Sequence, residues 1–182
     1  MVAAGAAILP WRPAIAPIER PGTDLYSAAT IERGRLAAAA GACNVCHVGT
    51  DGMAFGGGRP TETPFGVVYA SNISADPAAG IGAWSYAAFA RAMREGVSRD
   101  GHLLYPAHPY TSFAKAAEAD IQALYAYLAA QPASPARTPV TDLRFPFGIR
   151  PMMAAWNALF LRPQRPADPD RGAEWNLSLI HI

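Results

Sequence analysis

Two cysteines and a histidine lie within one short segment, Cys43-Asn-Val-Cys-His47, and the chain has no other cysteine. The pattern Cys-x-x-Cys-His is the attachment signature of c-type haem. On one helical turn, two thiols three residues apart can each add to a haem vinyl group. The next residue, His47, then directs its imidazole at the iron. The spacing predicts one covalently bound haem c (heme c), held by Cys43, Cys46 and His47.

Three other interpretations of this segment remain open. A thioredoxin-like pair of cysteines follows a strand in a βαβ unit, whereas an alanine-rich helical stretch precedes this pair. A zinc site usually takes four ligands, and two cysteines with His47 leave one missing. The third is a chance grouping without chemistry. Covalent haem attachment takes place outside the cytoplasm, so the favoured interpretation also predicts export.

An electron-carrying haem usually needs a second axial ligand. The candidates are Met53, Met93, His102, His108, Met152 and Met153. We favour His108, because it lies in a proline-rich loop, Leu104-Tyr-Pro-Ala-His-Pro-Tyr110, between two expected helices. Proline restricts the backbone on both sides of it. The other candidates are expected to pack in the core, to be solvated, or to lie too close to His47 in sequence. His181, at the end of the chain, is not expected to take part.

The composition favours a small helical domain with long loops. About half of the residues are apolar, which is enough for a core, and the net charge is only +1. That charge argues against nucleic-acid binding, and 17 prolines with 16 glycines exclude a bundle of long helices. We expect an all-α, cytochrome c-like fold. The expected helices cover residues 27–42, 85–95 and 117–131, with a short helix near 152–161 and a possible strand at 65–70.

Start and stop signals support these helices. Ser27 or Thr30 can cap the first helix, Ser85 can cap the second, and Gly96 can end it. Gly34 lies inside the first helix, where glycine costs roughly 1 kcal/mol relative to alanine. A glycine at such a position often permits another helix to approach closely.

The chain is expected to divide into four parts. Residues 1–26 are an N-terminal segment with an extended, proline-rich linker. Its apolar start is too short to span a bilayer, and is either a disordered end or the remnant of an export signal or anchor. Residues 27–132 form the cytochrome c domain, and residues 133–176 a connector to a further haem domain. Residues 177–182 resemble the translated end of a DNA-library adapter, with a genuine short tail as the alternative.

Several stretches outside the haem motif occur together in one known family. They are Phe55-Gly-Gly-Gly58, Thr63-Pro-Phe-Gly66, Ser71-Asn-Ile-Ser74, Gly80-Ile-Gly-Ala-Trp-Ser85, Arg94-Glu-Gly-Val97, Leu104-Tyr-Pro-Ala-His-Pro-Tyr110, Ala123-Leu-Tyr-Ala-Tyr-Leu128 and Phe145-Pro-Phe-Gly-Ile-Arg150. From about residue 31 to 176 the chain resembles the first haem domain of the multi-haem cytochrome c subunit of membrane-bound bacterial dehydrogenases. These enzymes include alcohol, aldehyde and gluconate dehydrogenases.

The resemblance implies an all-α cytochrome c fold on the periplasmic side of the bacterial inner membrane. It implies that a dehydrogenase catalytic subunit donates electrons, which pass through further haem domains to quinone or a terminal oxidase. The loop after Phe55, with Asn72 and Trp84, would lie against the haem and its propionates. Two features depart from the family. The position of His108 is commonly methionine there, and the family continues beyond residue 176 into a second haem domain.

Three functions are compatible with parts of this pattern. An electron-transfer subunit fits one haem with both axial positions filled and no cluster of acid–base residues. A haem enzyme such as a peroxidase would need an open distal position on the iron, where His108 could act as a base. A haem-based sensor would also need an open position. The sequence favours electron transfer and gives no substrate, since substrate chemistry would belong to another chain.

Overall fold

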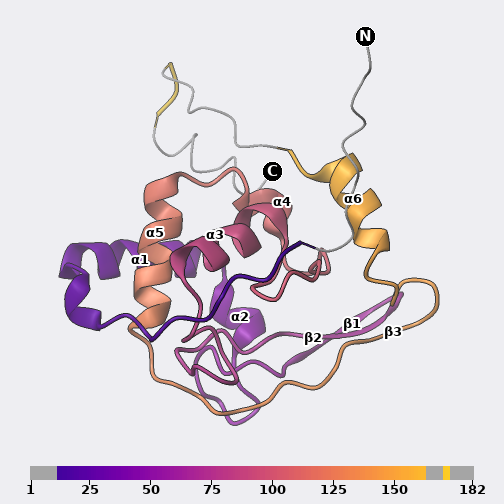
Figure 1. Cartoon of the computed structure of the whole chain (residues 1–182), viewed down its shortest axis with the longest axis horizontal. Helices are drawn as coiled ribbons and strands as arrows, with labels where there is room; N and C mark the ends of the chain where they lie inside the picture. Colours follow the sequence, from indigo (N-terminus) through magenta and orange to yellow (C-terminus); the bar gives the residue numbers. More distant parts are fainter. Residues whose placement is uncertain (1–11, 163–169, 173–182) are drawn as a thin grey trace.

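The computed structural model describes residues 12–162 and 170–172 of the chain (Figure 1). Its elements, in order, are η1 (Thr23–Leu25), α1 (Ala28–Ala40), α2 (Cys43–His47), β1 (Pro60–Thr63), β2 (Gly66–Tyr69), α3 (Tyr86–Glu95), α4 (Tyr110–Phe113), α5 (Glu118–Ala129), β3 (Asp142–Leu143) and α6 (Met152–Phe160). The apolar start of the chain, His181 and residues 177–182 lie outside the described residues.

The contact between α1 and α5 is the main helix–helix contact of the domain. Gly34, at the buried side of α1, makes it possible. A Cβ atom built on Gly34 would stand 2.0 Å from the carbonyl oxygen of Ala123 and 2.6 Å from Cβ of Tyr127. The expectation that this glycine admits another helix is therefore confirmed. An ion pair between Arg33 and Asp120, at 2.8 Å, ties the same two helices at the surface.

The hydrophobic core lies where α1, α3 and α5 meet, beside the haem-attachment segment. Its fully buried members include Phe89 of α3 together with Ile121, Leu124 and Leu128 of α5. Tyr125 lies at the centre of an aromatic group. Its ring centroid is 6.5 Å from that of Tyr26, 5.7 Å from that of Tyr86 and 5.5 Å from that of Phe89. The core thus fixes the positions of α3 and α5. In sequence, the loop that contains His108 lies between these two helices.

The predicted helices form with the predicted caps. The Ser27 side chain accepts a hydrogen bond from the Thr30 amide at 3.1 Å, and the Ser85 side chain accepts one from the Ala88 amide at 3.3 Å. Gly96 ends α3 with a φ of +64°, a left-handed conformation that favours glycine. The one-turn helix α4 was not predicted, because four residues after two prolines carry no helical periodicity.

A short antiparallel sheet modifies the all-α expectation. Its order is β1-β2-β3, with Thr63 opposite Gly66 in the hairpin and Gly66 opposite Leu143 on the other edge. Only the strand near residues 65–70 was predicted, and β2 occupies it. The partners were missed because β1 is exposed and polar and β3 has only two residues, so neither shows an alternating apolar pattern. The fold remains mainly helical.

The proline-rich linker is extended, as predicted, but it is bound along the domain. Its backbone amides at Arg12, Ile15 and Ile18 donate to the carbonyls of Gly101, Arg99 and Ala83, at 3.0, 2.8 and 3.0 Å. Arg20 donates to the carbonyl of Ala129 at 2.7 Å. Among the described residues, no helix is both long enough and apolar enough to cross a bilayer.

Candidate haem site

The haem-attachment motif forms its own short helix, α2, immediately after α1. Ala42 separates the two helices with a φ of +52°, a left-handed conformation that turns the chain sharply. The Cys43 thiol is half-buried against the core, and this burial raises its pKa to about 11. Cys46 is exposed, and both thiols are free. One helical turn therefore presents two unpaired thiols and, directly after them, an imidazole.

The imidazole of His47 is held by backbone from a distant loop. Its Nδ1 donates to the carbonyl oxygen of Ser71 at 2.6 Å, while its own carbonyl accepts from the Gly57 amide at 2.8 Å. Gly57 has a φ of +72°, and a Cβ there would stand 2.5 Å from the backbone of Ser71. Burial lowers the pKa of His47, and the hydrogen bond to Ser71 opposes that effect.

His108 lies in the loop between α3 and α4. Its imidazole stacks on Phe113 of α4, with ring centroids 5.7 Å apart and planes at 23°. Burial, together with a positive charge on His47, lowers the pKa of His108 to about 4. His47 and His108 come from segments far apart in sequence, and a charge on one affects the other.

The donor set of this site fits a haem c. The His47 imidazole uses one ring nitrogen on backbone, which is the usual arrangement of a histidine that binds a metal. The two imidazoles lie near two free thiols on one helical turn. Both histidines are neutral at pH 7, so each keeps a lone pair for iron.

Trp84 is half-buried against the core, and its indole N–H makes no hydrogen bond with any described residue.

Asn72, which was expected to lie against the haem, joins two segments of the protein through its side-chain amide. Its side-chain amide donates to the carbonyl oxygens of Ser134 and Ala136, at 2.8 and 2.9 Å, and accepts from the Ser74 amide at 2.9 Å. Asn72 is buried, and all three contacts are within the protein. Its amide therefore holds the segment after α5 against the loop before Ser74, and has no N–H left for a haem propionate.

The other candidate ligands have different surroundings. Met93 is buried in the main core, and Met153 packs against a small cluster that includes Val97 and Leu103. Met152 is exposed on α6. His102 was expected to be solvated, but its Nδ1 lies 2.7 Å from the carboxylate of Asp100 in an ion pair. None of these side chains has a ring contact like the one with Phe113 that positions His108.

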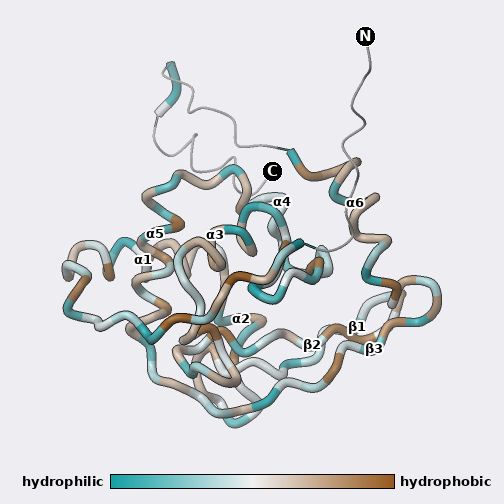
Figure 2. Tube along the Cα trace, viewed as in Figure 1, coloured by the Kyte–Doolittle hydropathy of each residue, from teal (hydrophilic) through white to brown (hydrophobic). Residues whose placement is uncertain are grey.

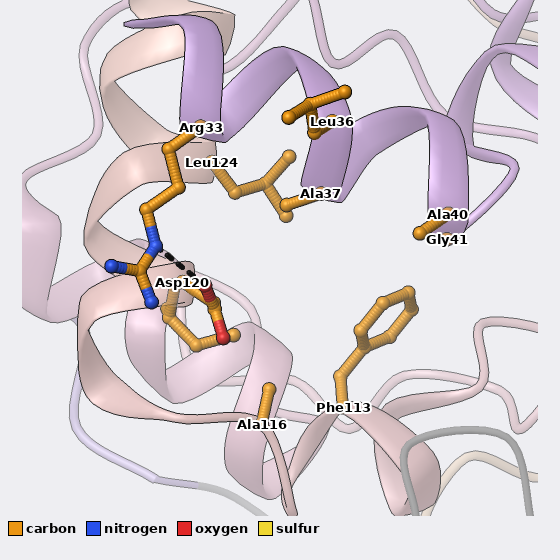
Figure 3. Close-up of a pocket in the computed structure, with 10 residues that line it drawn as sticks. Arg33, Leu36, Ala37, Ala40, Gly41, Phe113, Ala116, Asp120 and Leu124 are labelled. Carbon is orange, nitrogen blue, oxygen red and sulfur yellow. Dashed lines mark hydrogen bonds and ion pairs between the residues drawn. The ribbon is translucent and has the colours of Figure 1, made fainter. Parts of the chain in front are cut away.

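Two cavities flank the haem-attachment segment. One, of about 150 Å³, lies between α1 and the α4–α5 region (Figure 3). The Arg33–Asp120 ion pair lies at one end, and Gly41 and Phe113 at the other. A second cavity, of about 330 Å³, adjoins Ala42 and Asn44. Neither is lined by His47 or His108, so we assign the haem to neither. Phe113 lines the first cavity and also stacks on His108, so it lies between this cavity and the loop that contains His108.

Two residues important to this geometry were not found by sequence reasoning. Ser71 acts through its backbone carbonyl, which every residue carries, so its type gives no signal. Phe113 lies five residues after His108 and was not distinguished from a core aromatic residue. Ser71 does begin one of the stretches shared with the family, Ser71-Asn-Ile-Ser74. This shared stretch was the one signal in the sequence that the loop around Ser71 lies against His47.

Comparison with known proteins gives several relatives, although no protein-family model matches the chain. A subunit of nicotinate dehydrogenase from Pseudomonas putida is 56% identical over 172 residues, covering 94% of this chain and 14% of the relative. The gluconate 2-dehydrogenase cytochrome c subunit of Pantoea cypripedii is 40% identical, covering 75% of this chain and 31% of the relative. The cytochrome c subunit of alcohol dehydrogenase (quinone) from Gluconacetobacter polyoxogenes is 36% identical, covering 80% and 31%.

The chain spans less than a third of the length of each of these three relatives. The homology nevertheless covers most of the chain. It supports the cytochrome c fold and implies a covalently bound haem c. The chain is thus homologous, over most of its length, to part of the cytochrome c subunits of membrane-bound alcohol, gluconate, fructose and nicotinate dehydrogenases.

Proposed function

We propose that this chain is an electron-transfer domain with one haem c, attached through Cys43 and Cys46 and ligated by His47 and His108. The observation that carries the proposal is the orientation of the two imidazoles. His47 is held by its hydrogen bond to the carbonyl of Ser71, and His108 by its ring contact with Phe113. A ligand oriented in this way loses little freedom when it binds a metal.

The haem iron supplies one-electron transfer by alternating between ferric and ferrous states. The residues of the chain determine how easily it does so. If His47 and His108 both hold the iron, no position would remain for peroxide or a gas, which disfavours a peroxidase or a sensor. Imidazole is a stronger donor to ferric iron than a thioether, so His108 would favour the ferric state. The stacked ring of Phe113 excludes water from one side of His108.

We place this domain in an oxidoreductase complex, where a dehydrogenase catalytic subunit donates electrons to it. Further haem domains, quinone or a terminal oxidase would accept them. The relatives support this placement, because their names describe cytochrome subunits of dehydrogenases, one of them linked to quinone. Haem attachment outside the cytoplasm supports the periplasmic side of the inner membrane. Residues 27–132 would be the haem domain, and residues 133–176 would connect it to the next one.

A test of haem attachment separates this proposal from the alternatives. The chain is produced with a c-type maturation system, denatured on a gel and stained for haem. Haem should remain on the protein and resist acid–acetone extraction, whereas Cys46→Ala should lose one thioether and mature poorly. The ferric absorption spectrum should be low-spin. Extractable haem would refute the covalent attachment, and a high-spin ferric spectrum would restore the enzyme or sensor interpretation.

A further inference from the structure

Residues 96–109, which we call the His108 loop, connect α3 to α4 and are held together internally by turns. The Leu104 amide donates to the carbonyl of Gly96 at 2.7 Å, and the His108 amide donates to the carbonyl of Tyr105 at 3.1 Å. A loop stabilised in this way opens at a low free energy unless other segments pack on it. The position of His108 therefore depends on what binds the loop from outside.

The segment that leads into α6, and α6 itself, bind the middle of the His108 loop. The Tyr105 hydroxyl donates to the carbonyl of Gly148 at 3.1 Å. Arg150 donates to the carbonyl of Leu103 at 2.8 Å, and its guanidinium carbon lies 4.5 Å from the centroid of the Tyr105 ring. Ala154 of α6 is buried in one small cluster with Leu103. Arg150 thus holds both the backbone and a side chain of the loop shortly before His108.

One side chain of α6 connects the two ends of the His108 loop. Asn157 accepts a hydrogen bond from the Tyr110 hydroxyl at 2.6 Å and donates one to the carbonyl of Glu95 at 3.1 Å. Glu95 is the last residue of α3, and Tyr110, which is fully buried, is the first residue of α4. The rest of α6 is apolar (Figure 2). The amide of Asn157 therefore ties together the two helices between which the loop is suspended.

The N-terminal linker binds the first half of the same loop. Besides the linker amides that donate to the carbonyls of Arg99 and Gly101, Arg91 of α3 donates to the carbonyl of Pro13 at 2.7 Å and to that of Ser98 at 2.6 Å. In Figure 1 the linker, in indigo, and α6, in yellow-orange, reach this part of the chain from different sides. Two segments outside the expected haem domain therefore pack on the loop that presents His108.

We propose that Arg150 and Asn157 are positioning residues that keep His108 on the haem iron, and that residues 148–157 act as a clamp on the His108 loop. An axial imidazole leaves the iron only when its loop moves away, and each contact with the clamp raises the free energy of that movement. This inference rests on the proposed function, because it takes His108 as the axial ligand. It gives a role at the haem site to a segment that was expected only to connect this domain to the next.

The test measures the rate at which cyanide binds to the ferric protein with its haem attached, because cyanide takes the position that His108 vacates. Tyr110→Phe and Asn157→Leu each remove the hydrogen bond between α6 and the start of α4. Arg150→Ala removes the contacts with the middle of the loop. Each substitution should raise the rate of cyanide binding at least about fivefold, which is the effect on an opening equilibrium of losing one hydrogen bond.

Two substitutions of the same kind serve as matched controls. Tyr125→Phe removes a buried hydroxyl whose hydrogen bond, to the carbonyl of Trp84 at 2.7 Å, lies outside the clamp. Arg144→Ala removes an exposed arginine from the same segment of the chain. Both should bind cyanide at the parent rate, although Tyr125→Phe lowers the stability of the fold. A thermal unfolding curve for each variant shows that it is folded at the assay temperature.

The spectrum of the parent protein separates the failure of the clamp from the failure of the proposed function. A high-spin ferric spectrum, or the weak red band of methionine bound to ferric iron, would show that His108 is not the ligand and would refute both. A low-spin parent without that band, whose clamp variants bind cyanide no faster than the controls, would refute the clamp alone. Because the clamp variants remove different contacts, one that fails to fold leaves the others to decide.

Discussion

The imidazole of His108 lies nearly parallel to the ring of Phe113, with planes at 23° and centroids 5.7 Å apart. The one-turn helix α4 places Phe113 there. The loop between α3 and α4 therefore presents an imidazole that packs on the helix that follows it.

Replacing the distal imidazole should change the haem spectrum and potential. The parent protein should be low-spin and lack the weak red band that marks methionine bound to ferric iron. His108→Met should create that band and raise the midpoint potential, because a thioether stabilises ferrous iron. Spectroscopy and a redox titration measure both changes.

Met93→Leu is the control for the ligand assignment. Because Met93 is buried in the core, this variant should keep the parent spectrum, and its volume is nearly conserved. A methionine band in the parent protein that Met93→Leu removes would instead identify Met93 as the ligand.

Gly34→Ala tests the close approach of α1 and α5. Helix propensity alone would make the alanine variant more stable by roughly 1 kcal/mol. The added Cβ, however, would meet the carbonyl of Ala123 at 2.0 Å, so one helix must shift. We expect a net loss of about 1–3 kcal/mol in the free energy of unfolding. Urea unfolding followed by circular dichroism gives the sign, and an increase in stability would contradict the packing.

Asn72→Ala tests whether Asn72 supports the fold or the haem. The substitution removes the Asn72 partner of one buried carbonyl, one half-buried carbonyl and one buried amide, so stability should fall by about 2 kcal/mol or more. The midpoint potential of the haem should stay close to the parent value, because no N–H of Asn72 is free for a propionate. A large change in potential with unchanged stability would restore its assignment to the haem.

Tyr125→Phe tests a buried hydroxyl that links α5 to the loop before α3. The hydroxyl donates to the carbonyl of Trp84 at 2.7 Å, and its loss should cost about 1 kcal/mol. Burial raises the pKa of Tyr125 from 10.0 to about 12. The hydroxyl therefore stabilises the fold below pH 10, and its contribution is lost as the pH rises towards 12.

The stability difference between the parent protein and Tyr125→Phe should therefore shrink between pH 8 and pH 11. Urea unfolding at the two values measures it. Tyr110, whose pKa is also raised to about 12, is present in both proteins, so its effect cancels in the comparison. A difference that grows with pH would contradict the assignment.

The sequence by itself determined the chemistry of attachment and most of the helices. The spacing of Cys43, Cys46 and His47 is local, so one helical turn sets their geometry and no distant contact is needed. Capping residues such as Ser27 and Ser85, and the stop at Gly96, also act within a few residues. Signals of this range can be recognised in a single sequence.

Only the tertiary structure decided how the site is supported. The backbone carbonyl of Ser71 orients the imidazole of His47, but a backbone group has no residue type to recognise. Asn72 looked like a haem contact because of its place in a shared stretch, and the segment around Ser134 proved to occupy its amide. The strands β1 and β3 were also missed. A sheet is stabilised by pairing with other strands, and this pairing leaves no clear local pattern in a short strand.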